Sequence, residues 1–386
     1  MGKAMPYLDH AATTPVLEEV FEAMLPYLKG DFGNPSSVYT SGRRAKKGLE
    51  DAREQVAKAV GAQPREVIFT AGGTEADNLA LRGVAGSAGA SKHVVTSAIE
   101  HHAVLHTCEW LEKEGFEVTT LPVDGQGMIE ADSLERAIRP DTALVSIMWV
   151  NNEVGSIQDV LRAAEITKQR SGAVFHTDAV QALGKVDLDL SATAIDLASF
   201  SAHKVGGPKG VGCLVARGSV RLDPQLLGGG QERGLRSGTP NVAGIVGFGK
   251  AAEIAASRVD ETAERLEKLR DRLQEGILAS IDGVSVNGAG APRVSGILNV
   301  IIDGVEGEAL LLMLDEKGIE ASSGSACTSG SLDPSHVLTA MGVPTEKALG
   351  SLRLSFGSDS TDADVDEVLR VLPPVIERLR SVRGSR

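Results

Sequence analysis

The feature of the sequence that most constrains the fold is a regular alternation of short apolar runs with segments of helical length between residues 66 and 215. Each run has the length and apolar character of a buried strand. The expected strands are residues 66–70, 92–97, 116–121, 142–150, 173–177, 195–200 and 211–215. Strands separated by helices can pair in parallel, and a parallel sheet is covered on both faces. The sequence therefore predicts an α/β fold with a mostly parallel sheet covered by helices.

The end of the chain predicts a second, smaller unit. Residues 241–280 are an expected long helix, and apolar strands at 284–287 and 296–302 and a helix at 306–317 follow it. A chain of 386 residues with 42% hydrophobic content can bury two cores. We therefore expect a large domain at residues 15–255 and a smaller α+β domain made of residues 1–14 and 256–386.

Two expected strands end in residues with cofactor chemistry. Lys204 follows one strand in the segment SFSAHK, where a rigid and partly desolvated lysine could hold a carbonyl compound as a Schiff base. Ser201 and His203 supply hydrogen-bond donors to the same turn, as a phosphate requires. Asp178 ends the other strand, and pyridoxal phosphate needs a carboxylate against its ring nitrogen. Taken alone, Lys204 is more simply interpreted as an ordinary surface lysine beside a tight turn.

Further polar residues are expected at the same edge of the sheet. Gly73 and Thr74 lie in a turn of small residues between the first expected strand and a helix. Free backbone N–H groups at such a helix start can bind a phosphate. Asn152 follows the longest expected strand. Ligands of parallel sheets gather outside the carboxyl ends of the strands, so Asn152 should join Asp178 and Lys204 at one rim.

The three cysteines differ in their surroundings. Cys327 lies among small residues in SSGSACTSG, which we expect to be mobile and exposed. An exposed thiol is a liability unless its chemistry is used. Cys108 lies in an expected helix and Cys213 in an expected strand, and we interpret both as small core residues. With no CxxC pair, a reducing compartment is the natural inference.

Segments along most of the chain resemble the cysteine desulfurases of the NifS and IscS type, a pyridoxal-phosphate group within the class V aminotransferases. The matching segments, in family order, are YLDHAATTP (7–15), GNPSS (33–37), GGTEADN (72–78), EHHAV (100–104), VNNEVG (150–155), HTDAVQ (176–181), SFSAHKVGGPKG (199–210), GGGQERGLRSGT (228–239), SSGSACTSG (322–330) and RLSFG (353–357). Ala202 departs from the pattern, because many relatives have glycine there, and its methyl group should be tolerated.

The resemblance implies the fold type I of pyridoxal-phosphate aminotransferases, with a large sheet of the seven-stranded type, and it implies site residues. Lys204, Cys327 and His101 are implied to be catalytic. The implied cofactor-binding residues are Gly73, Thr74, His101, Asn152, Asp178, Gln181, Ser201, His203, Lys204 and Thr239. Thr239 would reach the phosphate bound by the partner subunit, so the resemblance implies a homodimer with shared active sites. Asn34, Asn152 and Arg353 are implied to bind the substrate.

The implied reaction removes sulfur from L-cysteine, gives L-alanine, and leaves a persulfide on Cys327 for a sulfur-accepting protein. That acceptor could serve iron–sulfur cluster assembly, tRNA thiolation or DNA sulfur modification. The alternatives are a class V transaminase, a cysteine or selenocysteine lyase without persulfide transfer, and a sulfur carrier without catalysis. A transaminase requires no mobile cysteine, and a carrier requires neither Lys204 nor Asp178.

Composition argues against other classes of partner. A formal net charge of −13 disfavours direct binding of nucleic acid. No apolar run approaches the roughly 20 residues that cross a bilayer, so we expect no membrane segment and a cytoplasmic protein. His102 and His106 have the i, i+4 spacing of metal ligands, but no third ligand with suitable spacing is apparent, so we expect no metal.

Overall fold

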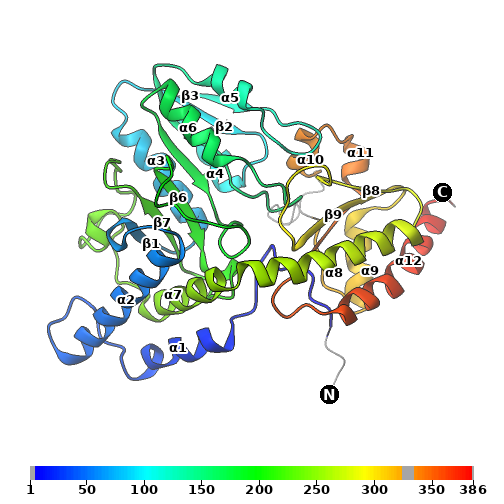
Figure 1. Cartoon of the computed structure of the whole chain (residues 1–386), viewed down its shortest axis with the longest axis horizontal. Coiled ribbons are helices and arrows are strands. Elements are labelled where there is room, and N and C mark those ends of the chain that lie inside the picture. Colours follow the sequence, from blue (N-terminus) through cyan, green and yellow to red (C-terminus); the bar gives the residue numbers. More distant parts are fainter. Residues whose placement is uncertain (1–4, 324–333, 385–386) are drawn as a thin grey trace.

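The computed structural model describes residues 5–323 and 334–384, and its main feature is a seven-stranded sheet (Figure 1). The strands are β1 (Val67–Thr70), β2 (His93–Ser97), β3 (Glu117–Leu121), β4 (Thr142–Ser146), β5 (Val174–Asp178), β6 (Leu197–Ser201) and β7 (Gly212–Ala216). Their order is β1-β7-β6-β5-β4-β2-β3, and every neighbouring pair is parallel except the two pairs that contain β7. The predicted α/β fold with a mostly parallel sheet is confirmed.

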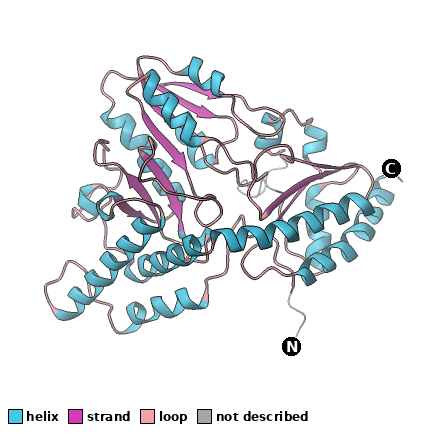
Figure 2. Ribbon diagram, viewed as in Figure 1, coloured by secondary structure: helices cyan, strands magenta, loops and turns pink. Residues whose placement is uncertain are grey.

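Helices cover both faces of this sheet (Figure 2). They are α1 (Glu18–Lys29), α2 (Thr40–Ala59), α3 (Gly73–Ser87), α4 (His102–Lys113), α5 (Ala131–Ala137), α6 (Val160–Arg170) and α7 (Val242–Ser257). Successive strand residues alternate between two cores, because side chains along a strand point to opposite faces. In β1, for example, Ile68 packs with α3 and α4, whereas Val67 and Phe69 pack with α2 and α7. Burial on both faces explains why the sequences of these strands are continuous apolar runs.

A second sheet has three antiparallel strands in the order β10-β9-β8. They are β8 (Val284–Val286), β9 (Ile297–Ile302) and β10 (Ser351–Ser355). The helices after residue 258 are α8 (Val259–Ser280), α9 (Gly307–Glu316), α10 (His336–Ala340), α11 (Thr345–Ala348) and α12 (Asp362–Gly384). The sheet shares a separate core with α8, α9 and α12, which Leu8 from the N-terminal segment joins. Separate cores support two domains, and the boundary near residue 255 stays a prediction.

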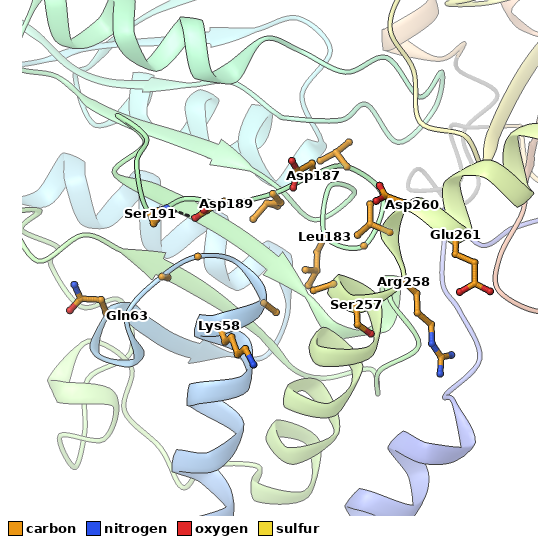
Figure 3. Close-up of a pocket in the computed structure, with 18 of the residues that line it drawn as sticks. Lys58, Gln63, Leu183, Asp187, Asp189, Ser191, Ser257, Arg258, Asp260 and Glu261 are labelled. Carbon is orange, nitrogen blue, oxygen red and sulfur yellow. Dashed lines mark hydrogen bonds between the residues drawn. The ribbon is translucent and has the colours of Figure 1, made fainter.

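Two predicted elements are shorter than expected. The strand predicted at 142–150 ends at Ser146. Beyond Ser146, isolated backbone hydrogen bonds still join the chain to β5, such as the one from the Trp149 N–H to the Asp178 carbonyl (2.9 Å). The helix predicted at 241–280 is two helices, because Arg258 is not helical (φ −124°, ψ 17°). The break lets α7 pack on α1 and α2 while α8 packs on α12. A cavity of about 980 Å³ lies beside it (Figure 3).

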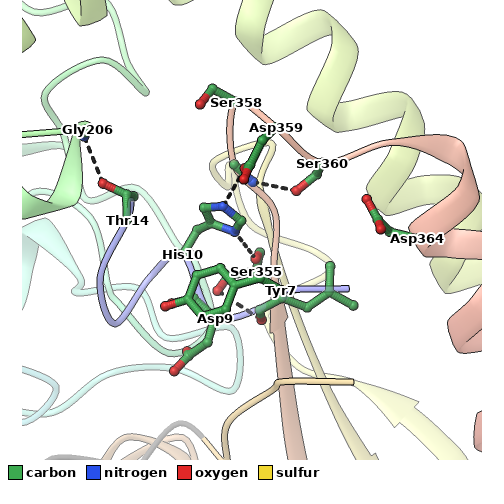
Figure 4. Close-up of polar contacts among 12 residues, drawn as sticks. Tyr7, Asp9, His10, Thr14, Gly206, Ser355, Ser358, Asp359, Ser360 and Asp364 are labelled. Carbon is green, nitrogen blue, oxygen red and sulfur yellow. Dashed lines mark hydrogen bonds and ion pairs between the residues drawn. The ribbon is translucent and has the colours of Figure 1, made fainter. Parts of the chain in front are cut away.

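The N-terminal segment crosses from the small sheet to the large one (Figure 4). His10 forms a hydrogen bond with the Ser355 carbonyl through Nδ1 (3.1 Å) and one with the Asp359 carboxylate through Nε2 (2.8 Å). Four residues later, the Thr14 hydroxyl accepts a hydrogen bond from the Gly206 N–H (2.8 Å). The segment therefore connects the end of β10 with the turn that follows β6.

A buried ion pair holds the loop that precedes α7. Glu232 accepts hydrogen bonds from Arg53 Nη1 (2.9 Å) and Nη2 (2.7 Å) and from the Phe69 N–H (2.9 Å). Both side chains of the ion pair are nearly inaccessible to solvent. Arg236 extends the connection through Glu75 (2.8 Å). The loop that carries Thr239 is therefore fixed against α2, α3 and β1.

We predict that Glu232→Ala lowers the free energy of unfolding by about 3–5 kcal/mol, because it leaves the Arg53 guanidinium buried without its partner. Urea denaturation at fixed protein concentration measures this change. The control is Glu264→Ala, which breaks the exposed pair with Lys268 and should change stability little. A loss in Glu232→Ala no larger than in the control would contradict the structural role of this pair.

Candidate active site

Several of the predicted site residues meet at the carboxyl ends of neighbouring strands. Asp178 is the last residue of β5 and Ser201 the last of β6, and these two strands are paired in parallel. A short 3₁₀ turn, Ala202–Lys204, follows β6 directly and places Lys204 at the same rim. Ala202 is fully buried, and a Cβ at Gly207 would lie 2.8 Å from its methyl group. Glycine at 207 therefore makes room for the alanine that departs from the family pattern.

Lys204 is half-buried and held by backbone carbonyls. Its Nζ donates to the carbonyl oxygens of Ala11 (2.8 Å) and Ala12 (2.7 Å). Gln181 joins the same turn, because its Nε2 also donates to the Ala11 carbonyl (2.8 Å) and its Oε1 accepts from the Lys185 amine. The N-terminal segment thus positions two of the predicted site residues.

Asp178 is a buried carboxylate at the end of β5. Its Oδ1 accepts the Val180 N–H (2.9 Å). Burial raises the pKa of Asp178 to about 6, while the Val180 N–H and the Lys204 cation act in the opposite direction. A cationic ring nitrogen against this carboxylate would favour its charged form, so Asp178 fits the cofactor that the sequence implies.

The predicted phosphate residues line one cavity of about 840 Å³, which Gly73, Thr74, Ser201 and His203 share. The start of α3 directs backbone N–H groups there. A Cβ at Gly73 would lie 2.7 Å from the Val180 side chain, so glycine keeps this backbone close to its neighbour. These residues fit a phosphate group.

Two histidines at the rim are neutral at pH 7. The Ala103 N–H donates to His101 Nδ1 (3.0 Å), so the ring proton is on Nε2. Burial, with the Lys204 cation, lowers the pKa of His101 to about 4. Burial, with the cations of Lys204, Lys209 and Lys185, likewise lowers the pKa of His203 to about 4.

Arg353 lies on β10 with 2% of its surface exposed. Its Nη2 donates to Asp9 Oδ1 (2.6 Å), and its Nη1 donates to the Asn152 carbonyl (3.0 Å). The Nε is buried without a hydrogen-bond partner among the described residues. Arg353 therefore contacts the backbone of Asn152, and the binding of substrate by these two residues stays a prediction. Sequence reasoning missed Asp9 and the Ala11 and Ala12 carbonyls, although the YLDHAATTP segment that contains them had been noted.

Other predicted residues are not brought to this rim. Asn34 is exposed between α1 and α2, and its side chain caps the nearby Ser36 N–H (2.9 Å). Thr239 is exposed in the loop before α7.

Cys327 lies outside the described residues, but the flanking residues are placed. Ser322 pairs with Arg353 through two backbone hydrogen bonds (2.6 and 3.2 Å). On the other side, the Ser335 hydroxyl donates to Glu153 Oε2 (2.5 Å), one residue after Asn152. One anchor is therefore on Arg353 and the other is next to Asn152.

The remaining features of the described residues concern metal binding, a second cavity and membrane spans. Among residues 5–323 and 334–384, no group of three or more His, Cys, Asp or Glu side chains is placed to hold a metal ion. His102 instead stacks on His106, with ring centroids 4.8 Å apart. The cavity of Figure 3 is lined by none of the predicted site residues. No helix within the described part of the chain is both long and apolar enough to cross a membrane.

Comparison with known proteins agrees with this geometry. A family model described as aminotransferase class V matches residues 6–368. A cysteine desulfurase IscS of Methanosarcina thermophila is 53% identical, with 97% of this chain and 93% of the relative covered. The IscS of Dictyoglomus turgidum is 48% identical, with 97% and 95% covered.

Solved structures give the same result. One named as a NifS-like protein has a TM-score of 0.90 and 38% identity, with 99% of this chain and 100% of that chain covered. DndA from Streptomyces lividans has a TM-score of 0.77 and 43% identity, with 90% and 99% covered. The chain therefore belongs to the class V aminotransferase family and, within it, to the cysteine desulfurases.

Proposed function

We propose that this protein is a pyridoxal-phosphate-dependent cysteine desulfurase that moves the sulfur of L-cysteine to Cys327 and releases L-alanine. The observation that carries the proposal is the meeting of Lys204, Asp178 and the phosphate cavity at one rim, beside Arg353. The residues on both sides of segment 324–333 are anchored to this rim. A transaminase would require no cysteine between these anchors.

Different residues would hold different parts of the cofactor. Gly73, Thr74, Ser201 and His203 would bind its phosphate, and Asp178 would keep the ring nitrogen protonated. When bound, pyridoxal phosphate supplies an aldehyde that Lys204 can hold covalently and a cationic ring that withdraws electrons from the substrate.

Arg353 would bind the carboxylate of L-cysteine, because its buried Nε has no hydrogen-bond partner among the described residues and a carboxylate would supply one. The pairing with Asp9 keeps the guanidinium in place before the substrate arrives. Once displaced by the substrate amine, Lys204 would move the proton at Cα. The neutral His101 ring carries its proton on Nε2 and could donate it in a hydrogen bond without burying a charge.

The Cys327 thiolate would attack the sulfur of the substrate. The carbon–sulfur bond of the substrate breaks, and a sulfur–sulfur bond forms on Cys327. L-cysteine and one protein thiol thereby give L-alanine and one protein persulfide, so atoms and electrons balance without a further oxidant. The persulfide would pass to an acceptor protein of iron–sulfur assembly, tRNA thiolation or DNA sulfur modification.

We also propose a homodimer with shared active sites. Large apolar side chains are exposed on α1 and in the two loops that follow α1 and precede α7. They include Phe21, Leu28, Phe32, Val38, Leu226 and Leu227. Exposed apolar surface of this kind indicates a protein interface. Thr239 lies in the second loop, where it could reach the phosphate site of a partner. A cytoplasmic location is supported by the free thiols of Cys108 and Cys213.

The test of function is Cys327→Ser. This variant should still bind pyridoxal phosphate and L-cysteine, because Lys204, Asp178 and Arg353 are untouched, but formation of alanine and sulfide should fall by at least about a hundredfold. Cofactor absorbance and an alanine assay measure the two properties. The control is Cys108→Ser, because burial raises the pKa of Cys108 to about 12 and makes it a poor nucleophile. Full activity in Cys327→Ser would overturn the proposal.

The test of the dimer is Leu227→Asp. Leu227 is 83% exposed in the Thr239 loop, and a charge there should shift the protein toward monomers and weaken cofactor binding. Analytical ultracentrifugation and cofactor titration give the two readings. Leu312→Asp is the matched control, since Leu312 is 67% exposed on α9, away from both loops. A wild-type protein that sediments as a fully active monomer would refute the homodimer.

A further inference from the structure

Lys185 lies in the turn that follows β5, a second lysine near the rim. The turn begins after Asp178, the last residue of β5. Its backbone is closed by hydrogen bonds from the Ala182 N–H to the Ala179 carbonyl (2.9 Å) and from the Lys185 N–H to the Ala182 carbonyl (2.9 Å). Gln181 and Lys185 are four residues apart in this turn, and their side chains form a hydrogen bond. The end of β5 therefore carries Asp178, Gln181 and Lys185 on one short segment.

The two ends of the Gln181 amide have partners of opposite kind. Its Oε1 accepts a hydrogen bond from the Lys185 amine, and its Nε2 donates to the Ala11 carbonyl (2.8 Å). A lysine ammonium can only donate, and a carbonyl oxygen can only accept. If the amide were turned over, its oxygen would face the Ala11 carbonyl oxygen and its N–H groups would face the Lys185 amine. Those contacts are repulsive, so the two partners fix which end of the amide is nitrogen.

This arrangement extends to Lys204. The Ala11 carbonyl accepts hydrogen bonds from Gln181 Nε2 and from Lys204 Nζ, both at 2.8 Å. Gln181 is only 4% exposed, so little water can take the place of either of its partners. An amide nitrogen has two N–H groups, and the second one of Gln181 has no hydrogen-bond partner within residues 5–323 and 334–384. That group remains for a ligand.

The position of Lys185 is unfavourable for a cation. The side chain is half-buried, and burial together with the cations of Lys204 and Arg353 lowers the pKa of Lys185 to about 7. No carboxylate in the described part of the chain offsets these effects. Lys185 also borders a cavity of about 30 Å³ that Ala11 and Leu266 line, so an apolar side chain would find contacts there. Packing alone therefore does not explain a lysine at this position.

We propose that Lys185 is a positioning residue for the cofactor: its amine holds the Gln181 amide in the one orientation that offers an N–H to the cofactor and bonds the Ala11 carbonyl beside Lys204. The amine does this in either charge state, because a neutral amine still has N–H groups to donate and the Ala11 carbonyl still excludes the turned amide. This inference rests on the proposed function, because Gln181 is one of the predicted cofactor-binding residues.

The first test is the affinity of the apoprotein for pyridoxal phosphate. Lys185→Met removes the donor and keeps the length of the side chain, so the dissociation constant should rise about tenfold. Titration with pyridoxal phosphate, followed by the absorbance of the bound cofactor, measures it. The control is Lys268→Met on α8, where the lysine pairs with Glu264 at the surface, and the change should be less than about twofold. An unchanged affinity in Lys185→Met would overturn the proposal.

A double-mutant cycle separates an effect through Gln181 from an effect of charge or packing. In a Gln181→Leu protein there is no amide to hold, so adding Lys185→Met should weaken binding by less than about twofold further. The same loss of about tenfold in both backgrounds would show that Lys185 acts without Gln181, against the positioning role. Should Lys185→Met fail to fold, Lys185→Ala takes its place in both measurements.

The conservative variant Lys185→Arg gives a third reading. Its guanidinium still donates to Gln181, so the affinity should return to within about threefold of wild type. A value equal to that of Lys185→Met would contradict the assignment. These readings are binding constants and do not depend on turnover. Failure of the proposed function would appear instead as a wild-type protein that binds pyridoxal phosphate and releases no alanine from L-cysteine.

Discussion

The site depends on the buried ion pair between Arg353 of β10 and Asp9 of the N-terminal segment (2.6 Å). A guanidinium removed from water is costly unless it is paired, so Arg353 requires Asp9 beside it. The same guanidinium donates to the Asn152 carbonyl, beyond the end of β4. Two residues along β10, the Ser355 hydroxyl accepts the Ala11 N–H (2.9 Å). One cation therefore connects the small sheet, the rim of the large sheet and the turn whose carbonyls hold Lys204.

The electrostatics of the rim follow from burial. Desolvation keeps the imidazoles of His101 and His203 neutral, so they can form hydrogen bonds without placing more charge near Lys204. Desolvation also raises the pKa of Asp178, and the Lys204 cation opposes that rise. The Lys204 cation thus acts on the Asp178 carboxylate beside two neutral imidazoles. Such an arrangement suits a zwitterionic ligand with an anionic phosphate, a cationic ring and an aldehyde.

Local patterns in the sequence were enough to predict the sheet, its helices and the rim where Asp178, Ser201 and Lys204 lie. These features are indicated by hydrophobic periodicity, by the residues at strand ends and by turn residues. The pairing of Arg353 with Asp9 could not be predicted in this way, since 344 positions separate them and only the folded small sheet brings them together. The break at Arg258 was missed because the residues around it are compatible with a helix and only packing on two different sheets interrupts it. Asn34 and Thr239 are exposed in one subunit, so their part in the site stays a prediction that depends on a partner.

The most direct test of the account is mass spectrometry of the wild-type protein after brief exposure to L-cysteine labelled with a heavy sulfur isotope. The account predicts one labelled sulfur atom on the peptide that contains Cys327. It predicts none on the peptides of Cys108 and Cys213, whose thiols are buried and whose pKa values burial raises. Labelled sulfide and alanine released with no sulfur on Cys327, or sulfur found only on another cysteine, would contradict the proposed transfer and leave the fold and the family unchanged.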